Sequence, residues 1–229
     1  MLKGIVTDVF FDLDHTLWDF ERNSALTFKK ILNGFGLKID LERFLQAYAP
    51  INQEYWRLYR EEKVSQAELR YQRLRKTFDA IDIRVEHSTI NMLSQAYIEH
   101  LSSFNHVFPG TIDILEYLKP NYKLHIITNG FQEIQQKKLK NANIDTYFVH
   151  IINSEMAGVK KPNPHIFQLA LQLANVKPGN ALMIGDNLEA DILGAQSAGF
   201  HTLHFNPEGH PAHGFCKMIL SLNEIKTVL

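Results

Sequence analysis

The chain has 229 residues, with 24 lysines and arginines against 25 acidic residues and a single cysteine, Cys216. A net charge of −1 without runs of like charge gives no reason to expect a nucleic acid polymer or a membrane as a partner. We expect a cytoplasmic protein, because one cysteine cannot form an intrachain disulfide and neither a signal peptide nor a membrane-spanning apolar stretch is found.

Five short apolar runs, rich in β-branched and aromatic residues, predict the strands of a sheet. They are residues 3–11, 122–128, 147–152, 181–184 and 201–205. Helical patterns separate the later runs. One begins at an Asn163 cap with Pro164 in the first helical position, and another covers 188–198 and ends at Gly199. Strands that alternate with helices favour an α/β fold with a doubly wound parallel sheet.

Residues 18–106 interrupt this alternation, because they carry helical patterns without a convincing strand. The expected helices are residues 23–33, 41–49, 54–63, 65–78 and 88–101, with Asp40, Ser65 and Ser88 as caps and Ser65 with Glu68 as a capping box. We therefore expect an inserted all-α helical bundle, and residues 1–17 and 107–229 as the α/β core. Both connections lie near the C-terminal edge of the sheet, where such folds bind ligands, so the bundle can act as a cap.

Four polar clusters each follow a predicted strand or begin a predicted helix. They are Asp12-Leu13-Asp14-His15-Thr16, Thr128-Asn129-Gly130, Lys160-Lys161-Pro162, and Gly185-Asp186 with Asp191. Each cluster alone fits an ordinary turn, surface lysine or helix cap. Together they bring acids and phosphate-binding groups to one edge of the sheet, which chance explains poorly. Mg²⁺ prefers oxygen ligands, and the carboxylates of Asp12 and Asp186 with the backbone carbonyl of Asp14 can supply them.

With these four motifs in this order, the chain resembles the haloacid dehalogenase (HAD) superfamily of phosphatases over essentially its whole length. The resemblance implies a Rossmann-like core with strand order 5-4-1-2-3 and an aspartyl-phosphate mechanism. It assigns Asp12 as the nucleophile, and Asp14 as the acid that protonates the leaving group and then activates water. Mg²⁺ is the implied cofactor, and it bridges Asp12 and the phosphoryl group.

The resemblance also assigns the groups around the phosphate. Thr128 and Lys161 hold the phosphoryl oxygens, with Asn129 and Gly130 beside them in the second motif. Lys161 is chosen over Lys160 because the family lysine directly precedes the proline. Thr16 and Asp191 are assigned to positions next to the ligating and catalytic groups, where Asp191 orients Lys161 or the water ligands of the metal.

The ester that is cleaved is less well defined by the sequence. Residues 17–21 resemble the pyrimidine 5′-nucleotidases of the superfamily, although His15 stands where the typical member has an acid. Asp14 favours an oxygen leaving group over a halide, which needs no proton. Aromatic residues of the insert can stack on a base, but burial preferences favour the bundle core for Tyr48, Tyr55, Trp56 and Tyr59.

We therefore expect a phosphatase for a small phosphorylated metabolite, with a nucleoside 5′-monophosphate as the favoured substrate and a monomer or small homo-oligomer as the assembly. The alternatives are a phosphosugar phosphatase, a phosphomutase that shields its aspartyl-phosphate from water, and a non-catalytic phosphate-binding regulatory protein. A binding protein has no need of the second acid, Asp14, which counts against the last alternative.

Overall fold

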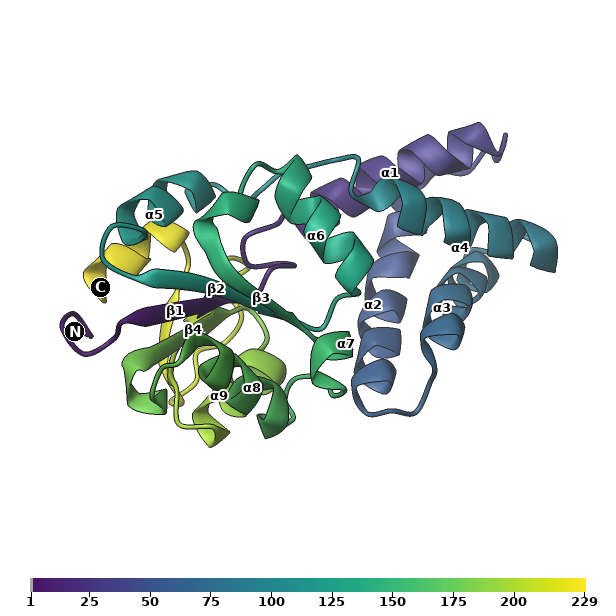
Figure 1. Ribbon diagram of the computed structural model, residues 1–229. Coiled ribbons are helices and arrows are strands. Elements are labelled where there is room, and N and C mark those ends of the chain that lie inside the picture. Colours follow the sequence, from purple (N-terminus) through teal and green to yellow (C-terminus); the bar gives the residue numbers. More distant parts are fainter. Residues whose placement is uncertain (1) are drawn as a thin grey trace. The chain divides into compact units, whose positions relative to one another are not determined.

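The computed structural model of the chain describes residues 2–229 and divides them into two compact units. The first unit holds the residues up to Phe20 together with Asn105–Leu229, and the second holds Glu21–Phe104. All the strands belong to the first unit (Figure 1). Across residues 2–229, no helix is long and apolar enough to cross a membrane.

A parallel sheet in the order β3-β2-β1-β4-β5-β6 forms the centre of the first unit (Figure 1). The strands are β1 (Asp8–Phe11), β2 (Lys123–Thr128), β3 (Phe148–Asn153), β4 (Ala181–Gly185), β5 (His201–Phe205) and β6 (Lys217–Ile219). The predicted order of five strands, 5-4-1-2-3, is confirmed. A sixth strand, β6, was not predicted, because this edge strand of three residues is too short to show a period.

Helices cover both faces of this sheet, with α8 and α9 on one face and α5 and α6 on the other (Figure 1). The helical segments of this unit are α5 (Thr111–Leu118), α6 (Gln132–Asn141), η1 (Asp145–Tyr147), α7 (Ser154–Ala157), α8 (Pro164–Ala174), η2 (Pro178–Asn180), the π-helical turn η3 (Leu188–Leu193), α9 (Gly194–Ser197) and η4 (Leu222–Thr227). Asn163 caps α8 as predicted, and Gly199 follows α9 with a φ of 86°. On the α8 and α9 face, Phe10 of β1 packs with Phe167 and Ala195 in a continuous core.

A buried histidine lies inside the sheet, away from the predicted motifs. His125 of β2 is fully buried, and its Nε2 lies 2.9 Å from Oδ1 of Asp8 on β1. Its ring stacks on Phe10 at 4.5 Å and on His150 at 5.4 Å. Burial lowers the pKa of His125, the Asp8 carboxylate opposes this, and His150 lowers the pKa further.

We expect His125 to make the protein less stable in mild acid. Its pKa is lower in the folded state than the ordinary value, so between these two values the unfolded chain binds more protons. The contribution of His125 to the free energy of unfolding is therefore complete above its ordinary pKa of about 6.5, and it falls as the pH falls below that value. Urea unfolding of the wild type and His125→Gln between pH 7.5 and 5 measures this difference. The exposed His165→Gln is the control, and an equal pH dependence in all three proteins would contradict the assignment.

The second unit is a bundle of the helices α2 (Leu41–Arg60), α3 (Gln66–Ala80) and α4 (His87–Leu101), with most of α1 (Phe20–Gly34). Its core is aromatic and contains Phe28, Phe44, Tyr48, Phe78 and Tyr97, all of them buried. Phe28 lies 4.6 Å from both Tyr48 and Tyr97, measured between ring centroids. Tyr48 is therefore a core residue, as the burial preferences favoured.

Two predicted features of the helical insert are wrong and two are confirmed. The predicted helices 41–49 and 54–63 form one helix, α2, which continues through Pro50 because its side with Phe44, Tyr48 and Asn52 is buried and α2 packs on α3. The last helix begins at His87 with Glu86 in the cap position, so Ser88 is not its cap. Asp40 caps α2, and Ser65 with Glu68 forms the predicted capping box.

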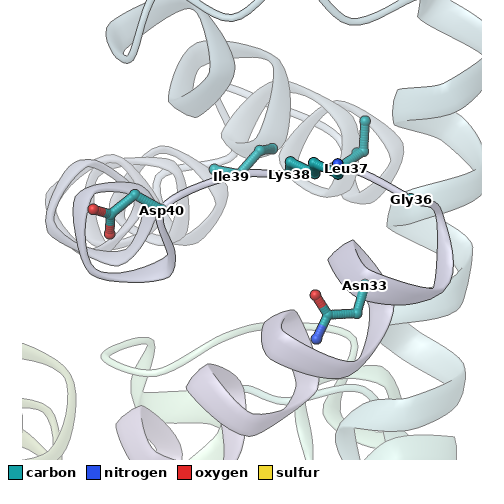
Figure 2. A pocket seen from close by; sticks show the side chains of 6 residues that line it. All are labelled: Asn33, Gly36, Leu37, Lys38, Ile39 and Asp40. Carbon is teal, nitrogen blue, oxygen red and sulfur yellow. The ribbon is translucent and has the colours of Figure 1, made fainter.

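An open hollow of about 510 Å³ lies beside the connection from α1 to α2 (Figure 2). It is lined by Asn33, Gly36, Leu37, Lys38, Ile39 and Asp40. The Asp40 carboxylate accepts hydrogen bonds from the backbone N–H groups of Glu42 and Arg43, so it serves as a helix cap. The hollow brings no group of catalytic side chains together.

Candidate active site

The first predicted acid lies directly after β1. The backbone N–H of Asp12 donates to the carbonyl of Ile184 at 2.9 Å, which continues the pairing of β1 with β4 by one residue. The Asp12 side chain is 11% exposed, and its Oδ1 accepts a hydrogen bond from Lys161 Nζ at 2.5 Å. Lys161, from the third motif, thus fixes one carboxylate oxygen of Asp12 at the C-terminal end of β1.

Lys161 is buried and fixed at both ends. Its Nζ donates to the carbonyl of Ile127 at 2.7 Å and lies 2.6 Å from Oδ1 of Asp191, in addition to its bond with Asp12. Its backbone is held by the Asn129 side chain, whose Oδ1 accepts from the Lys161 N–H at 2.7 Å and whose Nδ2 donates to the Lys161 carbonyl at 3.0 Å. Both polar atoms of the Asn129 amide therefore serve to position the lysine.

The acids of the fourth motif follow β4. Asp186 accepts a hydrogen bond from the buried hydroxyl of Thr16 at 2.9 Å, measured from Oγ1 to Oδ1. Asp191 lies in η3, and its Oδ2 accepts from the Asn187 N–H at 3.0 Å. A Cβ at Gly185 would lie 2.3 Å from Oδ2 of Asp191, so only glycine at this position lets the carboxylate approach the end of β4.

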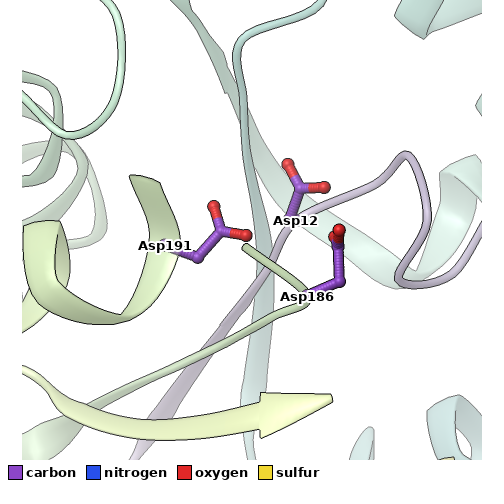
Figure 3. A group of neighbouring side chains, drawn as sticks. All are labelled: Asp12, Asp186 and Asp191. Atoms are coloured by element: carbon purple, nitrogen blue, oxygen red, sulfur yellow. The ribbon is translucent and has the colours of Figure 1, made fainter. Parts of the chain in front are cut away.

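Three of these acids form one group. One carboxylate oxygen from each of Asp12, Asp186 and Asp191 lies within 4.8 Å of the other two. Figure 3 shows the side chains beside one another, where β1 and β4 end and η3 begins. Lys161 contacts two of the three, so its one positive charge faces three carboxylates. The group therefore carries an excess of negative charge.

The pKa values reflect this excess. Burial raises the pKa of Asp12 well above its ordinary value, Lys161 opposes this, and Asp191 and Asp186 raise it further. Burial and the neighbouring Asp191 raise the pKa of Asp186 to about 7. Burial alone would lower the pKa of Lys161, but the carboxylates of Asp12 and Asp191 raise it above its usual value. A divalent cation with oxygen ligands fits this group, because it would supply the missing positive charge.

Two further polar residues of this region lie on α6 and were missed in the sequence. Gln135 Nε2 donates to Asp14 Oδ2 at 2.8 Å and to Thr128 Oγ1 at 2.7 Å. Lys138 Nζ donates to the other carboxylate oxygen of Asp14 at 2.5 Å. The available signal was the position of Lys138, which lies one turn after the buried Ile134 on the apolar side of the helix.

The predicted residues therefore lie in two adjoining groups at the C-terminal ends of the strands. Asp12, Thr16, Lys161, Asp186 and Asp191 form the acid group, while Asp14 and Thr128 are linked through Gln135. The side chain of Asp14 is turned to α6, which leaves its backbone carbonyl as its predicted metal ligand. Gly130 donates its N–H to Thr128 Oγ1 at 3.1 Å.

Comparison with known proteins places the chain in a family. Residues 9–199 match the family of haloacid dehalogenase-like hydrolases. The chain is 31% identical to the pyrimidine 5′-nucleotidase YjjG of Escherichia coli over 208 residues, which cover 88% of this chain and 89% of that protein. It is 32% identical to a glyceraldehyde 3-phosphate phosphatase of Pyrococcus abyssi over 205 residues, which cover 86% and 80%.

A solved structure is similar over almost the full length. The HAD-hydrolase YfnB of Bacillus subtilis, bound to magnesium, superposes with a TM-score of 0.88 at 26% identity, covering 98% of this chain and 99% of that one. The matched length includes both the sheet and the helical insert.

Proposed function

Because the chain belongs to the haloacid dehalogenase-like hydrolases and is a phosphoric monoester hydrolase, we propose that it is a Mg²⁺-dependent phosphatase that cleaves nucleoside 5′-monophosphates. The observation that carries the proposal is the grouping of Asp12, Asp186 and Asp191 at the end of the sheet, with Lys161 paired to Asp12 and Asp191. The nucleotide preference is supported by similarity to two pyrimidine 5′-nucleotidases, from E. coli and Streptococcus pneumoniae, each 31% identical.

In the first step, Asp12 attacks phosphorus in line with the ester oxygen. Lys161 holds Oδ1 of Asp12, and Oδ2 forms the new bond to phosphorus while the bond from phosphorus to the ester oxygen breaks. Asp14 gives its proton to that oxygen, so the product leaves as an alcohol. Thr128 donates a hydrogen bond to a phosphoryl oxygen, and the backbone N–H groups of Asn129 and Gly130 lie in the same motif. The three N–H groups of Lys161 are directed at Ile127, Asp12 and Asp191, so Lys161 stabilises the phosphoryl oxygens through its charge.

In the second step, water hydrolyses the aspartyl-phosphate. The Asp14 carboxylate takes a proton from water as the water oxygen bonds to phosphorus, and the bond between phosphorus and Asp12 breaks. Inorganic phosphate leaves, Asp12 is again a carboxylate, and Asp14 again carries its proton. The proton count is balanced over the cycle.

The proposed metal site consists of the carboxylates of Asp12 and Asp186 with the backbone carbonyl of Asp14, supported by Thr16 and Asp191. Bound Mg²⁺ would offset the repulsion between the Asp12 carboxylate and the anionic phosphoryl group. The excess negative charge of the acid group supports this assignment. As part of the same proposal, residues 18–106 serve as the cap, and the enzyme is a cytoplasmic monomer or small homo-oligomer acting on a small metabolite.

A second candidate substrate is a small phosphosugar such as a triose phosphate. Similarity to several archaeal glyceraldehyde 3-phosphate phosphatases favours it, with 30–33% identity over most of the chain. The catalytic residues and steps would be the same, since they act on the phosphoryl group that both esters share.

Phosphate release from a panel of esters tests the function. With Mg²⁺ we expect the highest kcat/KM for uridine or thymidine 5′-monophosphate, lower values for triose and hexose phosphates, and no isomerised sugar phosphate. A chelator should stop release, and Ca²⁺ should restore it poorly because its coordination shell is larger and looser. Full activity in chelator would contradict the metal assignment. Equal low rates across the panel would leave phosphatase activity without the nucleotide preference.

A further inference from the structure

Two side chains from α6 bind the carboxylate of Asp14. Neither of them has a part in the catalytic steps proposed above. Lys138 Nζ donates to Oδ1 at 2.5 Å and Gln135 Nε2 donates to Oδ2 at 2.8 Å, so both carboxylate oxygens are engaged. The Asp14 side chain is 22% exposed, whereas that of Lys138 is 3% exposed. Two bonds to opposite oxygens fix the rotation of a carboxylate, which a single bond does not.

Gln135 also connects the acid to the phosphate-binding motif. The same Nε2 atom donates to Thr128 Oγ1 at 2.7 Å, so the Gln135 amide bridges the Asp14 carboxylate and the hydroxyl at the end of β2. The Gln135 side chain fits here because residue 130 is glycine: a Cβ there would lie 2.2 Å from Gln135 Nε2 and 2.5 Å from its Cδ. Gly130 is thus required for the passage of the Gln135 side chain.

Lys138 lies in a surrounding that fixes its ammonium group. Its Nζ is 4.2 Å from the ring centroid of Trp18 and 5.6 Å from that of Phe20. Trp18 is fully buried, and both rings follow the first motif in sequence. Aromatic faces favour a cation electrostatically and exclude water from it. A buried lysine that is paired and enclosed in this way has little freedom to leave the carboxylate.

We propose that Lys138 and Gln135 are positioning residues that orient the Asp14 carboxyl for proton transfer to the leaving oxygen. This inference rests on the proposed function of Asp14. Both residues bind the Asp14 carboxylate, and Gln135 also links it to Thr128. Asp14 takes part in both steps, but only the first step depends on the leaving group. The contribution of the two residues is therefore larger where the leaving group requires a proton, and smaller where only the activation of water by Asp14 needs them.

The choice of leaving group separates this role from a structural one. The leaving group of uridine 5′-monophosphate is the 5′-alkoxide of uridine, which needs protonation. The leaving group of p-nitrophenyl phosphate is the stable p-nitrophenolate, which does not. For Lys138→Met we expect kcat on the nucleotide to fall by about 30-fold, part of the 10²- to 10⁴-fold that general acid catalysis gives. KM should change by less than about twofold and kcat on p-nitrophenyl phosphate by less than about fivefold, since phosphate binding is intact. Lys137→Met, an exposed neighbour on α6, should match the wild type on both esters.

A double-mutant cycle with Asp14→Asn tests whether Lys138 acts through the acid. We expect Asp14→Asn with Lys138→Met to be as slow on the nucleotide as Asp14→Asn alone, because the positioned group is already lost. Gln135→Met provides an independent arm in case Lys138→Met does not fold, and it should show the same dependence on the leaving group. Equal losses on both esters, or additive losses in the cycle, would overturn the inference. Wild-type nucleotide turnover in Asp14→Asn would instead overturn the proposed mechanism.

Discussion

Replacing Asp12 by asparagine is expected to reduce turnover by about 10⁴-fold or more, the order of loss seen when a covalent nucleophile is removed. The amide keeps the size of the side chain but cannot bond to phosphorus as a carboxylate does. The variant should remain folded. Burial, with the neighbouring Asp191 and Asp186, raises the pKa of Asp12 and disfavours its charged form, so the neutral amide lowers both the cost of burial and the repulsion. We expect its free energy of unfolding without metal to equal or exceed that of the wild type.

Steady-state phosphate release and urea unfolding measure these two effects on the same preparation. Asp113→Asn, which changes an exposed acid on α5, is the matched control and should alter neither. Substantial turnover by Asp12→Asn would exclude the aspartyl-phosphate mechanism. A large loss of stability would show that Asp12 is mainly a structural partner of Lys161, and that the acid group is not under electrostatic strain.

The sheet was predictable because its central strands are buried on both faces. Such strands appear in the sequence as continuous apolar runs, and the boundaries of residues 201–205 agree with β5. At the edge this signal is absent, and β6 with its pattern Lys217-Met218-Ile219 was missed. In the helical insert, local capping rules found the start of α3 at Ser65 but failed at Pro50. There the packing of α2 against α3 outweighs the cost of one lost backbone donor.

The candidate site was predictable where function depends on the ends of strands. Asp12 and Asp186 each follow a strand and Thr128 ends one, so topology alone brings them to one edge. Residues in the middle of a helix have no such marker, which explains why Gln135 and Lys138 were missed. Asn129 shows a further limit. Its residue type is suited to phosphate binding, but only the structure shows that its amide holds the backbone of Lys161.

Replacing Lys161 by methionine is expected to lower the free energy of unfolding by about 3 kcal/mol or more at pH 8, because removal of one partner leaves buried charges uncompensated. The wild-type lysine has a raised pKa in the folded state, so its stabilising contribution is fully present below its ordinary pKa and persists at pH 8. The loss of unfolding free energy in Lys161→Met should be smaller at pH 5.5. At that pH the acids with raised pKa values, Asp186 at about 7 among them, can bind protons and so lose the negative charge that Lys161 neutralises. Turnover should be lost as well, since Asp12 loses its donor and the phosphoryl oxygens lose a nearby positive charge. Urea unfolding at the two pH values, with the half-buried neighbour variant Lys160→Met as control, measures the effect. An equal loss at pH 8 and pH 5.5, or an equal loss in the control, would show that the ammonium does not serve to neutralise the acid group.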